Sequence, residues 1–112
     1  MSVKPVHEEP EVEVFAWHFV RVEGFIRLVG YRTSDRMGRI TSGIADVDMT
    51  AREVTTASGR VYHLRGDPDA VAAARVLRRH CEKWALPITE VALVDADEVT
   101  LLYAQPSMHG FN

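Results

Sequence analysis

Arginines and hydroxyl-bearing residues gather at the polar turns between residues 31 and 66. The arginines are Arg32, Arg36, Arg39, Arg52, Arg60 and Arg65, and the hydroxyls belong to Thr33, Ser34, Thr41, Ser42, Thr56 and Ser58. Guanidinium forks beside hydroxyls and glycine amides are the groups that phosphate oxygens require. Tyr31 and Tyr62 add surfaces on which nucleic acid bases could stack. Arginines at strand edges also keep a sheet soluble and discourage edge-to-edge pairing, so the same pattern has a purely structural interpretation.

Nucleophilic catalysis would fall to Cys81, the single cysteine of the chain. It lies on the apolar stripe of a predicted helix, where burial keeps a thiol protonated and unreactive. His80 is its neighbour in sequence, but adjacent side chains on a helix diverge by about 100° and do not face each other. The sequence contains no Gly-x-Ser-x-Gly nucleophile elbow. We therefore expect a structural Cys81 and a protein that is not an enzyme.

Metal ligands are not gathered in the sequence in the way that a metal site requires. The five histidines stand singly, at His7, His18, His63, His80 and His109. Asp46, Asp48 and Thr50 repeat the start of a calcium-binding loop. The glycine that such a loop needs is replaced by Ala51, and its closing glutamate is replaced by Ala57. We therefore expect no metal and no other cofactor.

The composition is that of one folded domain. The chain has 112 residues, of which 46% are hydrophobic and 26% are charged, and its net charge is -3. An acidic balance is atypical of nucleic-acid-binding domains, which are usually strongly basic. The single cysteine favours a reducing compartment, and the acidic, proline-containing start does not resemble a secretory signal. Because no apolar run approaches the roughly 18–20 residues that cross a bilayer, we expect a cytoplasmic protein that does not bind membranes.

A long strand is predicted over residues 12–22 from its β-branched and aromatic content. Simple alternation places Val12, Val14, Ala16, His18, Val20 and Val22 on one face. The other face carries Phe15, Trp17 and Phe19, which could form a ligand pocket or a partner anchor but more commonly belong to a core. Glu23-Gly24 is a turn signal, and strand character resumes to residue 33, so residues 12–33 predict a β-hairpin.

Shorter elements follow the hairpin. Strand-like runs at residues 40–47, 53–56 and 61–65 are separated by tight polar turns, which predicts a meander. Two further strands are predicted over residues 89–94 and 99–104, around an acidic turn.

One principal helix is predicted over residues 68–85. Asp67 is its expected N-cap, Pro68 suits the first helical position, and Pro87 ends the helix. Its apolar stripe is predicted to consist of Val71, Ala74, Leu77, Cys81 and Trp84.

These elements predict an α+β fold, either an antiparallel β-meander or a small open barrel of about five to seven strands with that one principal helix. Residues 1–10 are expected to form a flexible acidic N-terminal arm, residues 11–104 a single domain, and residues 105–112 a loose C-terminal tail. The strands and helices do not alternate as β-α-β, which argues against a doubly wound nucleotide-binding fold.

The function expected from these features is that of a small non-catalytic protein-binding module, such as an adaptor, an inhibitor or an immunity-type protein. An exposed sheet edge, and a helix with arginines beside an apolar stripe, can dock another protein. The expected contact residues are Arg36, Arg39, Arg60 and Tyr62. The alternative is a nucleic-acid-binding accessory protein that uses the arginine-rich β-turns, with an affinity that falls steeply with salt. An uncovered edge strand also permits a homodimer.

Overall fold

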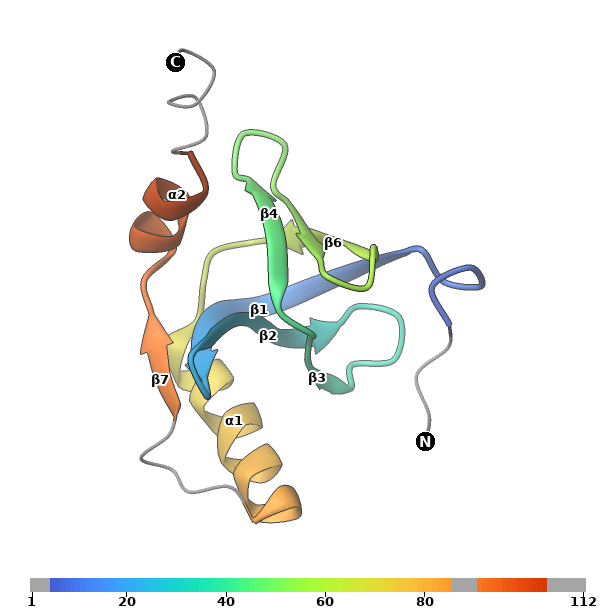
Figure 1. The fold of residues 1–112 in the computed structure, drawn as a ribbon. Helices are drawn as coiled ribbons and strands as arrows, with labels where there is room; N and C mark the ends of the chain where they lie inside the picture. The colour runs from blue at the N-terminus through green and yellow to red at the C-terminus, as the bar shows by residue number, and fades with distance from the viewer. Residues whose placement is uncertain (1–4, 86–90, 105–112) are drawn as a thin grey trace.

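The computed structural model describes residues 5–85 and 91–104, which contain seven strands and two helices (Figure 1). The strands are β1 (Glu11–Val22), β2 (Phe25–Arg32), β3 (Gly38–Ile40), β4 (Ile44–Asp48), β5 (Glu53–Thr56), β6 (Val61–Arg65) and β7 (Val91–Val94). The helices are α1 (Ala70–Trp84) and α2 (Ala96–Ala104). The predicted α+β class and the predicted number of strands are confirmed.

Six strands form one open sheet in the order β3-β2-β1-β6-β5-β4, and β7 also pairs with β1. The ladders are antiparallel except for β1 and β6, which run parallel. The predicted antiparallel meander is therefore present, but the sheet as a whole is mixed. Two antiparallel meanders, β1-β2-β3 and β4-β5-β6, lie side by side. The link between β3 and β4 does not reverse the chain, so β4 runs in the same direction as β3. As a result, β6 runs in the same direction as β1.

The sheet is strongly curled because its two edge strands follow each other in the chain. β3 and β4 stand at opposite ends of the strand order, yet only residues 41–43 separate them. Backbone bonds fix this link to both meanders, from Thr41 N–H to the Leu28 carbonyl at 2.9 Å and from Ala57 N–H to the Gly43 carbonyl at 2.7 Å. The two edges approach each other without pairing, so the sheet stops short of a closed barrel.

Two apolar clusters hold the fold together. The interior of the curled sheet contains Val12, Val14, Trp17, Phe19, Leu28, Val54, Tyr62, Leu64, Val94 and Val99. The second cluster lies between the outer face of the sheet and α1, and it contains Val20, Val22, Val29, Ala73, Val76 and Leu77. α1 therefore covers the sheet from outside (Figure 1), rather than filling its interior.

The predicted hairpin of residues 12–33 is confirmed by β1 and β2. Glu23 and Gly24 form its two-residue turn, with φ of 53° and 86°. Both values are positive, as a type I′ hairpin turn requires.

The predicted alternation along β1 is wrong beyond Phe15. The pairing with β2 shifts register between Phe15 and His18, and Ala16 adopts a φ of 49°. This β-bulge exchanges the two faces of the strand. Val14 and Trp17 consequently share the interior, while Val20 faces α1. Two of the three expected anchor aromatics, Trp17 and Phe19, are core residues with 1% and 0% exposure.

The principal helix begins at Ala70, two residues later than predicted, and its N-cap is Asp69 rather than Asp67. The Asp69 carboxylate accepts a hydrogen bond from the Ala72 N–H at 3.0 Å. The buried face of the helix is rotated from the predicted stripe. Ala73 and Leu77 are buried, whereas Val71 is 71% exposed.

The second helix replaces the strand predicted over residues 99–104. Asp97 and Glu98, taken together as part of a turn, lie in its first turn, where carboxylates favour the positive end of the helix dipole. Val99 is buried in the interior cluster and Tyr103 packs against the same cluster one turn later, at helical i, i+4 spacing.

Some predictions fall outside the described residues. They are the helix stop at Pro87, the start of the strand predicted from residue 89, residues 1–4 of the arm and the tail of residues 105–112. Within the arm, Glu8 and Glu9 donate their N–H groups to the Pro5 carbonyl, both at 3.0 Å, and the Pro10 carbonyl accepts from Val61 N–H.

Candidate functional site

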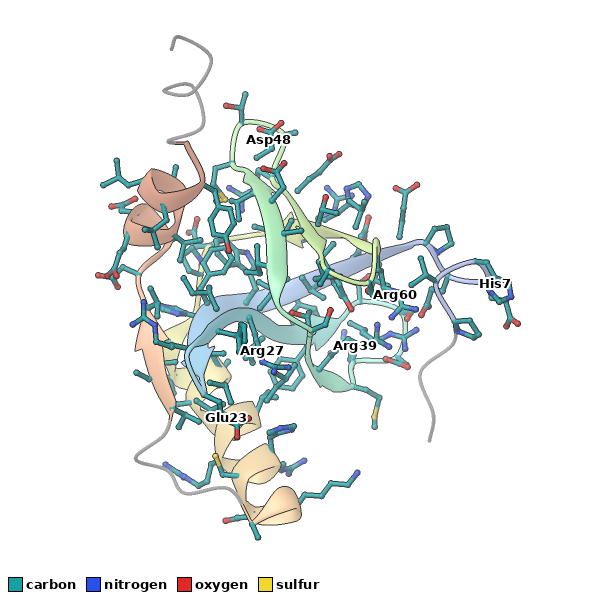
Figure 2. All side chains as sticks on the ribbon, in the orientation of Figure 1. His7, Glu23, Arg27, Arg39, Asp48 and Arg60 are labelled. Atoms are coloured by element: carbon teal, nitrogen blue, oxygen red, sulfur yellow. The ribbon has the colours of Figure 1, made fainter. Side chains whose placement is uncertain are left out.

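Three of the four predicted contact residues come together between β3 and the β5–β6 turn of the curled sheet. Arg39 on β3, Arg60 in the β5–β6 turn and Tyr62 on β6 line one cavity of about 230 Å³. Figure 2 shows Arg39 and Arg60 beside each other in the gap between β3 and this turn. Arg36 lies apart, exposed in the β2–β3 turn with a φ of 60°.

These three side chains are too deeply buried to form a flat contact surface. Their exposed fractions are 9% for Arg39, 6% for Arg60 and 3% for Tyr62. The cavity is completed by Ile40 and by hydroxyl-bearing residues, namely Thr41, Ser42 and Ser58. Its polar lining is therefore made of hydrogen-bond donors and hydroxyls, with no carboxylate among the lining residues.

Glu9 contacts three arginines, although it does not line the cavity. Its carboxylate accepts from Arg32 Nη2 at 2.7 Å and lies 3.9 Å from Arg39 Nη2. Its backbone carbonyl accepts from Arg60 Nε at 2.9 Å. Glu9 was not among the predicted site residues, because it belongs to a segment predicted to be a flexible arm.

The remaining turn arginines do not join this cluster. Arg52 lies over the Trp17 ring, 5.9 Å from its centroid, and donates to the Leu64 and Gly66 carbonyls. Arg65 forms an ion pair with Glu13 on the outer face of the sheet. The arginine-rich turns thus divide into separate structural roles and do not present one continuous basic surface.

A second recess lies between α1 and β7, with a volume of about 370 Å³. Its apolar lining comes from Ala70, Val71 and Ala74 on the helix and from Leu93, which is 41% exposed, on the strand. Arg75 and Arg78 complete it, and none of its lining residues is acidic. No strand within residues 5–85 and 91–104 pairs with the outer edge of β7.

The outer face of β4, β5, β6 and β1 has the opposite charge. The strand register aligns Asp48, Glu53, His63 and Glu13 in one row across these four strands. His63 contacts Glu11 at 2.6 Å and Glu53 at 3.7 Å. The Arg65 and Thr33 hydrogen bonds lower the pKa of Glu13, and Glu13 in turn raises the pKa of Arg65.

The structure confirms that Cys81 is buried. His80 lines a third recess, of about 250 Å³, between α1 and β3, together with Arg79 and Lys83. Burial, followed by the charges of Arg27 and Lys83, lowers the pKa of His80. Burial and, secondarily, Asp46 raise the pKa of Tyr103, whose hydroxyl donates to the Ile44 carbonyl at 3.0 Å.

Comparisons with known proteins gave no match to a protein-family model, a curated protein or a solved structure. In the part of the chain that the structure describes, no group of three or more histidine, cysteine, aspartate or glutamate side chains could hold a metal ion. Neither α1 nor α2, the helices within those residues, has the length and apolar character to cross a bilayer.

Proposed function

We propose that the protein is a small non-catalytic binding module that docks an acidic, partly apolar segment of another protein in the recess between α1 and β7. The observation that supports this proposal most directly is the pairing of an uncovered strand edge with an exposed apolar helix flank bordered by arginines.

Apolar contact is the first contribution to docking. Val71 is 71% exposed and Leu93 is 41% exposed, and both line the same recess. Covering such side chains contributes about 25 cal/mol for each Å² of apolar surface removed from water. The open edge of β7 adds backbone donors and acceptors that an extended segment can pair with.

The positive charge beside the recess favours an acidic partner segment. Arg75 and Arg78 border the recess, and its lining contains no acidic residue. The acidic row across β4, β5, β6 and β1 repels the same partner. An acidic segment is therefore directed to α1, and long-range attraction of this kind raises association rates.

Nucleic-acid binding through the arginine-rich turns is the second candidate function and has less support. Arg39 and Arg60 are more than nine-tenths buried, and Arg52 and Arg65 are bonded within the protein. A phosphate backbone needs a row of accessible cations.

The proposed adaptor, inhibitor or immunity-type role belongs to the cytoplasm, the compartment that suits an unpaired buried cysteine.

Site-specific photo-cross-linking in the source cell tests the docking proposal. A photo-reactive amino acid is placed at Val71 or at Leu93, and the adducts are purified after nuclease treatment and identified by mass spectrometry. We expect the same protein adduct from both positions, joined through a segment rich in aspartate and glutamate.

Two matched controls sharpen this experiment. Leu102, an exposed apolar residue of α2, receives the same photo-reactive group and should give no such adduct. The double charge reversal Arg75→Glu and Arg78→Glu should reduce the adduct at Val71 at least tenfold, whereas Arg36→Glu should leave it unchanged. Adducts that vanish with nuclease, or that form equally at Leu102, would contradict the proposal.

A further inference from the structure

We propose that the cavity lined by Arg39, Arg60 and Tyr62 binds a small tetrahedral oxyanion of the phosphate class. This site lies on β3, the β5–β6 turn and β6, and it shares no residue with the recess between α1 and β7. The proposed anion site can therefore be tested independently of the proposed docking function.

The charge of Arg39 is the first argument. Its side chain is 8% exposed, and the carboxylate that faces it among the described residues is Glu9, at 3.9 Å. Glu9 makes its short contact, at 2.7 Å, with Arg32 instead. A buried charge is costly unless it is closely paired and hydrogen-bonded. An anion in the cavity supplies Arg39 with the close partner that Glu9 does not provide.

The directions of the donors are the second argument. Arg39 Nη1 donates to the Tyr62 hydroxyl at 3.4 Å, a long bond, and the guanidinium makes no other hydrogen bond to the described residues. Tyr62 keeps its own O–H as a donor when it accepts from Arg39. Ser42 and Ser58 bring further hydroxyls from two other segments. Donors that converge from several elements suit the oxygens of a tetrahedral anion, to which charged donors bind most strongly.

The size of the cavity indicates the size of the ligand. Its volume of about 230 Å³ is below the roughly 300–1,000 Å³ of sites that enclose drug-sized molecules. It accommodates a phosphate group with a few further atoms. The carboxylate-free lining of the cavity fits this class of ligand.

Thermal unfolding in sodium phosphate, compared with sodium chloride at equal ionic strength, is the first measurement. A ligand that binds only the folded state raises its stability with concentration. We expect Tm to rise with the logarithm of the phosphate concentration once that exceeds Kd, and to have risen by about 5 °C when phosphate reaches ten times its Kd. Sodium sulfate should act in the same way, and chloride should not.

Variants then assign the effect to the cavity. Arg39→Gln should weaken phosphate binding at least tenfold, as measured by titration calorimetry. Tyr62→Phe keeps the aromatic ring in the core and removes the hydroxyl, so it should weaken binding severalfold even where Arg39→Gln fails to fold. Arg36→Gln, in the exposed turn, is the matched control and should bind phosphate like the unmodified protein.

The source of the phosphate group is determined by two further titrants. A phosphomonoester such as glycerol phosphate that binds more tightly than inorganic phosphate identifies a small phosphorylated compound, and equal affinity identifies the free ion. Binding of a single-stranded oligonucleotide with no binding of either small anion would overturn the proposal. A phosphate effect that persists undiminished in both Tyr62→Phe and Arg39→Gln would overturn it as well.

Discussion

Two glutamates close together in the sequence have different environments and different effects on stability. Glu9 is mostly buried and shared by Arg32 and Arg39, so its removal would take the nearest carboxylate from Arg39 and leave Arg32 with only its longer contact to Asp35, at 3.7 Å. Glu13 is paired with Arg65 on an exposed face, where solvent and salt screen the attraction. We therefore attribute a structural role to Glu9 and little net stabilisation to the Glu13 ion pair.

His80 is a single residue that makes the free energy of unfolding depend on pH. Its pKa in the folded protein is lowered by burial and by Arg27 and Lys83, whereas in the unfolded chain it is near the ordinary value of about 6.5. Below that value the unfolded chain binds more protons than the folded protein does. The free energy of unfolding therefore falls as the pH decreases from about 6.5 towards the folded-state pKa.

His80→Gln should reduce this decline, since glutamine does not titrate. Urea unfolding at pH values from 7.5 to 5.5 measures the effect as a shallower slope for the variant. Glu13→Gln is the control, because a lowered glutamate pKa matters only at more acidic pH. Equal slopes for His80→Gln and the unmodified protein would contradict the assignment.

At the scale of single elements, capping explains where α1 begins. The Asp69 carboxylate accepts from Ala72 N–H, whereas Asp67 lies outside the helix. Asp69→Ala should lower the free energy of unfolding by about 1 kcal/mol, the usual loss on removing an N-cap. Asp67→Ala should change it by less than about 0.5 kcal/mol, as is usual for exposed positions. Chemical denaturation of both variants decides which aspartate is the cap, and a reversed order would refute the assignment.

The sequence predicted elements best where strong local signals agree. The hairpin of residues 12–33 and the existence of the principal helix follow from β-branched content, a turn signal and helical periodicity, and all were found. The bulge at Ala16 could not be predicted, because alanine carries no signal for a positive φ. Residues 99–104 were mistaken for a strand, since a short apolar run does not distinguish a strand from a helix.

The candidate sites were predictable only in part. Arg39, Arg60 and Tyr62 were selected from residue types near turns, and the structure places them in one cavity. Their burial and the contribution of Glu9 depend on the curling of the sheet, which brings residues distant in sequence together. Predicting the recess between α1 and β7 would likewise have required knowing which side of the helix is buried.

At the scale of the whole molecule, β1 belongs to both apolar clusters. Its residues Trp17 and Phe19 lie in the interior, and Val20 and Val22 pack with α1. Neither cluster can be lost without disturbing this strand. The domain should therefore unfold as one cooperative unit, as most domains of this size do.

Coincident unfolding transitions are the expected result of that shared strand. In a Trp84→Phe background, fluorescence reports Trp17 and far-UV circular dichroism reports the helices. Leu64→Ala, a change in the interior cluster, should cost about 2–5 kcal/mol and shift both signals together. Helical signal that survives after the Trp17 transition would show two separately folding units.

The position of β1 also determines when the protein can fold during its synthesis. β1 leaves the ribosome before its partners on one edge, because Glu11–Phe15 pair with Val61–Arg65 and Phe19–Val22 pair with Val91–Val94. Until β7 has emerged, one edge of Phe19–Val22 in the longest strand has no partner, and unpaired edges are aggregation-prone. The nascent chain therefore completes its sheet only after β7 has been synthesised, and a product cut short after α1 would be prone to aggregation.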